Sequence, residues 1–171
     1  MLRDKNLIPL SHQHQRALAL CVRIDRAQPI LEADLEEWQR EMEQLFEQEI
    51  DLHFMAEEEV IFPTAERFPE LIPLVEELKS DHTELRETFS RARSRRLAAE
   101  NLAAFAEQLS VHIRKEERQL FERMQSLLSS EELADLGRSL EAGLKAAAHS
   151  CALPGEATRL RAQKDVPVKN H

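Results

Sequence analysis

Apolar residues recur every three or four positions through most of the chain, and this spacing is the feature that most restricts its fold. It matches one face of an α-helix, which has 3.6 residues per turn, and not the alternation of a half-buried strand. Residues typical of strands and hairpin turns are scarce, because the 171 residues include three Gly and no Tyr. The sequence therefore predicts an all-α fold.

The first two helices are placed by capping and breaking residues. Ser11 is expected to cap a first helix over 11–27, with Pro29 following its end. A longer second helix is expected over 31–62, and the next residue, Pro63, is expected to end it.

Three more helices follow. Pro73 suits the first turn of a third helix, whose end we expect near 95–100. A fourth helix carries a long apolar stripe, and Ser129 with Glu132 forms a capping box for a fifth helix that continues to about residue 149.

This helix order predicts an up-down-up-down four-helix bundle with an additional C-terminal helix. We expect one domain over residues 1–150 and a tail without helical periodicity over 151–171. The net charge of −9 and the pI near 5.3 argue against a nucleic-acid partner or an anionic membrane surface. No apolar run approaches a membrane span or a signal peptide, so a cytoplasmic protein is expected, with a homodimer only weakly favoured.

Six polar residues interrupt the apolar stripes at positions that face a common core. They are His14, His53, Glu57, His82, His112 and Glu116. In both His-x3-Glu pairs the two residues lie one helical turn apart and share a face. The segments HFMAEEEVIF at 53–62 and HIRKEERQLF at 112–121 align, and each follows a helix with one histidine of this kind. The chain thus reads as two similar helical hairpins, each with two His and one Glu.

This set of side chains suits a pair of metal ions. Two buried carboxylates without partners would be expected to take up protons, whereas two cations bridged by both glutamates remove that cost. Four neutral imidazoles and two carboxylates carry two negative charges, so two divalent ions leave a positive site that draws in hydroxide or another anion. Imidazole and carboxylate ligands suit iron, and zinc and manganese are alternatives.

An interpretation without metal explains each of these residues singly but not their repeated pattern. A single histidine on an apolar face is usually a core residue with a hydrogen-bond partner, and a single His-x3-Glu pair is usually an exposed contact. Four histidines and two glutamates at repeated spacing favour the metal site instead. The Glu-x2-His pairs of ferritin-like bundles are absent from the sequence, which makes ferritin-type oxidation the weaker comparison.

The segments LSHQHQRAL, HFMAEEEVIFP, LKSDHTELRE and HIRKEERQLF resemble the hemerythrin-like HHE cation-binding family over roughly residues 8–127. The resemblance implies a hemerythrin-type bundle that holds two non-haem iron ions. It assigns His14 and His53 to one iron and His82 and His112 to the other. Glu57 and Glu116 would bridge the two ions.

One position departs from the oxygen-carrying members of this family. They have a second histidine one turn after the third-helix ligand, where this chain has Arg86. The four-His, two-Glu set resembles instead the repair-of-iron-centres proteins, although nothing here corresponds to their N-terminal cysteine-bearing domain. His12 is a candidate fifth ligand, but it lies about 200° around an ideal helix from His14. The adjoining Glu58 and Glu117 are expected in solvent or in outer contacts with the ligands. Asp81 could orient an imidazole, but a solvated position on the helix surface is expected for it.

Three functions follow as hypotheses. The first is a non-catalytic di-iron protein that binds O₂, NO or iron in sensing, storage or stress protection. The second is a di-iron enzyme that reduces peroxide or NO, or that repairs iron–sulfur centres. The third is a metal-free helical module in which the histidines are incidental.

Overall fold

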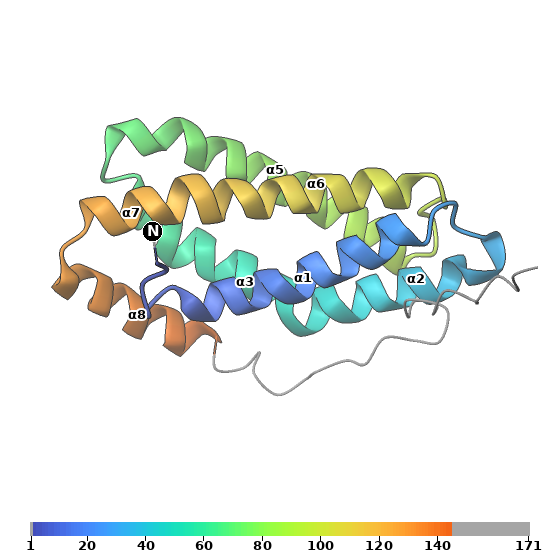
Figure 1. The fold of residues 1–171 in the computed structure, drawn as a ribbon, viewed down its shortest axis with the longest axis horizontal. Coiled ribbons are helices and arrows are strands. Elements are labelled where there is room, and N and C mark those ends of the chain that lie inside the picture. Colours follow the sequence, from blue (N-terminus) through green and yellow to red (C-terminus); the bar gives the residue numbers. More distant parts are fainter. Residues whose placement is uncertain (1, 145–171) are drawn as a thin grey trace, which may run out of the picture.

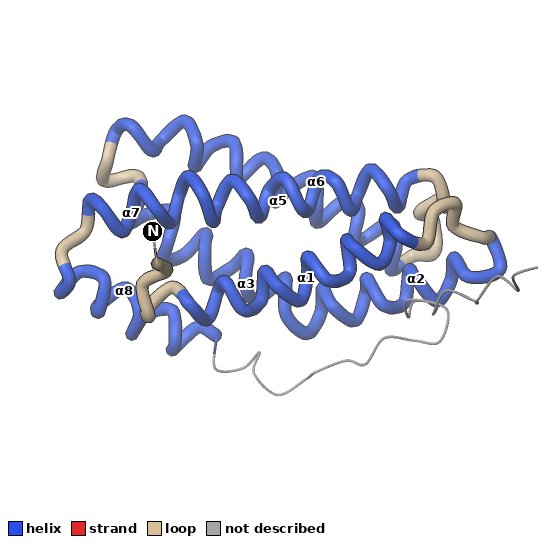
Figure 2. Tube along the Cα trace, viewed as in Figure 1, coloured by secondary structure: helices blue, strands red, loops and turns tan. Residues whose placement is uncertain are grey.

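The computed structural model describes residues 2–144, and this part of the chain forms five helical segments and no strand. Figures 1 and 2 show the helices joined by short loops. The helices have the following bounds, where η denotes a π-helical turn, except that η3 is a 3₁₀ turn: α1 (Ile8–Arg26); α2 (Glu32–Leu45), η1 (Phe46–Ile50), α3 (Asp51–Ala56), η2 (Glu57–Ile61) and α4 (Phe62–Ala65) as one continuous helix; η3 (Pro69–Leu71) and α5 (Ile72–Arg93); α6 (Asn101–Lys115), η4 (Glu116–Leu120) and α7 (Phe121–Leu127) as another; and α8 (Ser130–Leu144).

The four long segments run antiparallel to their neighbours in sequence, which confirms the predicted up-down-up-down bundle (Figure 1). α1 packs against α6 and α2 packs against α5, while α8 lies across one end of the bundle on α3 and η2. The predicted capping box is present, because the Glu132 N–H donates to Ser129 Oγ at 3.2 Å and the Ser129 N–H donates to Glu132 Oε2 at 2.9 Å. The predicted extension of this helix to 149 and the predicted tail at 151–171 lie outside the described residues.

The first helix begins earlier than predicted. It starts at Ile8, so that Ser11 lies inside its first turn and makes no cap. Pro9 occupies the first turn, where its fixed φ is already helical and its missing N–H would have had no partner within the helix. Pro9 was therefore the signal for this boundary, and the prediction from Ser11 was wrong.

The second helix continues past Pro63 to Ala65, contrary to the prediction that Pro63 ends it. The turn before Pro63 is a π-turn, in which the Phe62 N–H donates to the Glu57 carbonyl oxygen five residues back. This wider turn accommodates a residue that has no N–H and whose ring would collide with the carbonyl of a regular α-turn.

The third helix ends at Arg93, slightly before the predicted range. The Arg96 N–H donates to Arg91 O at 2.8 Å and the Arg95 N–H donates to Ala92 O at 3.0 Å, which together form a Schellman cap. Arg95 has the left-handed φ of 56° that this cap requires and that glycine adopts most easily.

We expect the free energy of unfolding of Arg95→Gly to be about 1 kcal/mol higher than that of Arg95→Ala. Both variants lose the ion pair between Arg95 and Glu43, so the difference between them isolates the left-handed backbone. Urea denaturation of the two variants measures it. Equal midpoints would show that this position carries no conformational strain.

The apolar core consists of two clusters with a polar layer between them. Near α8, one cluster contains Leu10, Ile61 and Phe62. Toward the other end of the bundle, the second cluster contains Ala17 and Phe54. The histidines and glutamates singled out above lie between these clusters. No helix in residues 2–144 is long and apolar enough to span a membrane.

Candidate metal centre

All six predicted side chains converge in the middle of the bundle, where each has at most 2 % of its surface exposed. Every one of the four long segments contributes: His14 comes from α1, His53 from α3, Glu57 from the start of η2, His82 from α5, His112 from α6 and Glu116 from the start of η4. They form two groups that share both glutamates, and within each group one ligand-type atom per residue lies within 4.8 Å of the others.

The two glutamates occupy equivalent positions in local structure. Each begins a π-turn, closed by the Phe62 N–H on the Glu57 carbonyl oxygen and by the Phe121 N–H on the Glu116 carbonyl oxygen. Single π-turns inside α-helices are frequent at functional sites. The sequence repeat is therefore also a repeat of backbone geometry, and this detail was not predicted.

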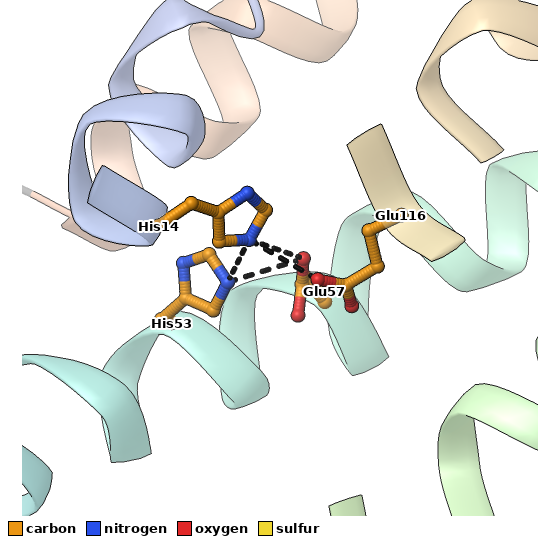
Figure 3. A group of neighbouring side chains, drawn as sticks. All are labelled: His14, His53, Glu57 and Glu116. Carbon is orange, nitrogen blue, oxygen red and sulfur yellow. Dashed lines mark hydrogen bonds and ion pairs between the residues drawn. The ribbon is translucent and has the colours of Figure 1, made fainter. Parts of the chain in front are cut away.

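One group contains His14, His53 and one oxygen of each glutamate (Figure 3). The two imidazole Nε2 atoms lie 2.9 Å apart. The His14 Nε2 lies 3.1 Å from Glu116 Oε2, and the His53 Nε2 lies 3.2 Å from Glu57 Oε1.

The second group uses the other oxygen of each glutamate. His82 Nε2 lies 3.3 Å from Glu57 Oε2, and His112 Nε2 lies 3.0 Å from Glu116 Oε1. Glu57 and Glu116 thus each direct one oxygen to the first group and one to the second, which is the arrangement of a bridging carboxylate.

Each imidazole is oriented through its outer nitrogen, Nδ1, by an acceptor from a neighbouring helix. These contacts are His14 to Glu117 Oε1 at 2.7 Å, His53 to Gln13 Oε1 at 2.8 Å, His82 to Glu58 Oε1 at 2.8 Å and His112 to Asp81 Oδ2 at 3.3 Å. Because an amide oxygen or a carboxylate can only accept, each Nδ1 carries the proton. When an imidazole is neutral, as a metal ligand must be, its Nε2 lone pair consequently faces the shared carboxylates.

These acceptors are themselves held in place. Arg3 donates to Glu117 Oε2 at 2.5 Å, and Arg86 donates to Glu58 Oε1 at 2.6 Å. Burial raises the pKa of Glu117, but the hydrogen bonds from His14 and Ser11 and the positive charges of His14 and Arg3 together outweigh it, and the pKa falls to about 2. The prediction that Asp81 lies in solvent is corrected, because it accepts from His112.

The centre has too few hydrogen-bond donors for its acceptors. Both oxygens of Glu57, both oxygens of Glu116 and the Nε2 atoms of His82 and His112 are buried without a hydrogen-bond partner. Unpaired buried polar atoms are costly, and a cation among them would satisfy all of them. The residues present therefore fit a metal pair, and the mixture of nitrogen and oxygen donors suits iron, zinc or manganese.

Without metal, protons take over part of this role. Burial lowers the pKa of the imidazoles, but Glu116 and the other carboxylates outweigh it. They raise the pKa to about 9 for His14 and for His82, and to about 10 for His112. Burial raises the pKa of Glu57 and of Glu116, yet the surrounding imidazoles hold both carboxyl pKa values below the usual range. Metal binding must displace these protons.

The remaining candidates lie outside the cluster. His12 is exposed and belongs to neither group. Arg86, in the position of the missing histidine, lies over the Phe54 ring and donates to Glu58, so it orients the acceptor of His82. The signal for these outer contacts was present in the sequence, since Gln13 and Asp81 each precede a ligand-type histidine and Glu58 and Glu117 each follow a glutamate of the cluster.

The hemerythrin HHE cation-binding domain family matches residues 9–125 of the chain. This range includes all six side chains of the cluster and ends within α7. Searches of curated proteins and of solved structures gave no match.

Proposed function

Because the chain belongs to the hemerythrin HHE cation-binding family, we propose that it binds two non-haem iron ions and uses them to bind O₂ or NO in sensing or stress protection, or to hold iron in storage. One observation carries the proposal. Glu57 and Glu116 each direct one oxygen to the His14–His53 pair and the other to the His82–His112 pair. Each half would then offer its metal two imidazole nitrogens and two carboxylate oxygens.

The charge of the centre supports a small anionic or polarisable ligand. Two carboxylates against two divalent cations leave an excess of positive charge in a buried place, which favours an anion or a ligand that accepts electron density. Bound iron would supply reversible electron transfer and open coordination positions. The protein would supply the fixed imidazoles and carboxylates, and the almost complete burial of these side chains favours a small ligand such as O₂, NO or peroxide.

Aromatic rings cover two of the imidazoles. The Phe54 ring stacks on His82 with ring centroids 3.8 Å apart, and the Phe121 ring stacks on His14 at 5.8 Å. Reduction of peroxide or NO consumes protons, which these two rings cannot supply, so an enzyme would have to take them from the polar contacts on Nδ1. A binding role therefore needs fewer groups than an enzymatic one does.

Metal analysis of protein purified without chelators or metal-affinity resin tests the proposal. We expect about two iron ions per chain and near-ultraviolet absorption from an oxo- or hydroxo-bridged pair. The double variant His53→Ala/His112→Ala removes one ligand from each half and should lose both ions. The matched control His12→Ala removes an exposed histidine and should keep them. A folded protein that takes up no metal on reconstitution would overturn the proposal.

Turnover separates the binding protein from the enzyme. The loaded protein would be given peroxide or NO beside the same concentration of free iron. Binding without turnover above that of free iron is the expected result. Turnover that the His53→Ala/His112→Ala variant loses would favour the enzyme.

A further inference from the structure

The two halves of the centre have matching outer contacts except at one place. In each half, the residue that precedes His14 or His82 in the sequence contacts the histidine of the following long helix. That residue is Gln13 for His53 and Asp81 for His112. One half therefore has a neutral amide where the other has a carboxylate.

The negative charge of Asp81 is not neutralised by its ion-pair partner, Lys115. Lys115 Nζ lies 2.8 Å from Asp81 Oδ2, but it also lies 2.7 Å from Glu77 Oε1. Two carboxylates thus share one ammonium group beside His112. Asp81 in an ion pair with Lys115 is a charged carboxylate near neutral pH.

The other outer acceptors do not offset this difference. Glu117 is paired with Arg3 and Glu58 with Arg86, one carboxylate and one guanidinium on each side. The half with His82 and His112 is therefore more negative by about one charge in its nearest outer contacts.

A charged acceptor on Nδ1 strengthens the imidazole as a ligand, because it favours the proton on Nδ1 and pushes electron density toward Nε2. Loss of such an outer partner typically lowers metal affinity by about 10- to 100-fold. We propose that the two metal positions are inequivalent, an inference that rests on the proposed metal site. The His82–His112 position binds its ion first, and Asp81 and Gln13 set the order.

Titration with Zn²⁺ alone tests this order, since zinc accepts the same nitrogen and oxygen donors and leaves NMR signals sharp. Metal-free protein with nitrogen-15-labelled histidine would be titrated to about two equivalents. During the first equivalent we expect the Nε2 signals of His82 and His112 to shift, and those of His14 and His53 only during the second. Signals that shift together, or the opposite order, would overturn the inference while leaving the metal site intact. Failure of any Zn²⁺ to bind would overturn the proposed function as well.

Two isosteric variants assign the order to the named residues. Asp81→Asn keeps an acceptor oxygen but removes the charge, and it should lower the first affinity by about 10-fold or more and merge the two steps. Gln13→Glu adds the charge to the other half and should also merge them, by strengthening the second step. The control Glu84→Gln removes a charge from the same helix, at an exposed residue that contacts Gln108, and should leave both steps unchanged. Unaltered steps in both isosteric variants would overturn the assignment.

Discussion

Glu116→Gln is expected to lower the bound iron from about two ions per chain to well below one. The reason is that Glu116 serves both halves, with Oε2 3.1 Å from the His14 Nε2 and Oε1 3.0 Å from the His112 Nε2. An amide keeps one oxygen, replaces the other ligand oxygen with an NH₂ group that does not coordinate a metal, and removes one negative charge. We expect the affinity of both positions to fall by more than about 100-fold, beyond the effect of losing an outer hydrogen bond. Elemental analysis after loading and desalting measures the change.

Glu59→Gln is the matched control, because it removes the same charge from an exposed residue of the 53–62 segment, in the first hairpin. It should keep both ions. Circular dichroism of the metal-free variants checks folding, which Glu116→Gln should preserve because it removes a buried charge. Loss of a single ion would show that Glu116 binds only one position, and full retention would show that it is no ligand.

The convergence of the six side chains could be predicted because it depends on local geometry. His53 and Glu57 lie one turn apart on one helix, as do His112 and Glu116, and the apolar residues around them define which face is buried. The repeat then implies that the two pairs meet. Nothing beyond helical periodicity and one alignment within the chain is needed for that step.

The outer contacts could not be predicted with the same certainty because they depend on the rotation of one helix against another. Asp81 lies beside a ligand-type histidine in sequence, yet it contacts His112 on a different helix. A small change in the packing of α5 on α6 would leave it in solvent, as we predicted. The π-turns at Glu57 and Glu116 are likewise set by tertiary packing, since single-residue propensities do not distinguish a π-turn from an α-turn.

The metal-free protein is expected to lose stability between about pH 6.5 and about pH 8.5, whereas the metal-loaded protein keeps it. In the absence of metal, the folded-state pKa is about 9 for His14 and His82 and about 10 for His112, against 6.5 in the unfolded chain. The stability from these protonated imidazoles is complete below pH 6.5. It declines above that pH, because the unfolded chain releases protons that the folded chain retains, and it is gone once the pH exceeds the folded values. Each retained proton contributes a slope of about 1.4 kcal/mol per pH unit.

Bound metal takes the place of these protons in the folded state, so the folded loaded protein holds no imidazole protons to lose across the window. The unfolded chain releases its imidazole protons near pH 6.5, which does not lower the stability of the loaded protein. The difference in thermal midpoint between zinc-loaded and chelated protein should therefore widen as pH rises. Measurements stop near pH 8.5 because burial raises the pKa of the Cys21 thiol from 9.0 to about 11, which adds a slope of its own at higher pH. The variant Glu57→Gln/Glu116→Gln lacks the carboxylates that raise the histidine pKa values, and it should lose most of the slope. A midpoint of the chelated wild-type protein that stays constant across the window would mean that the cluster holds no protons in place of metal.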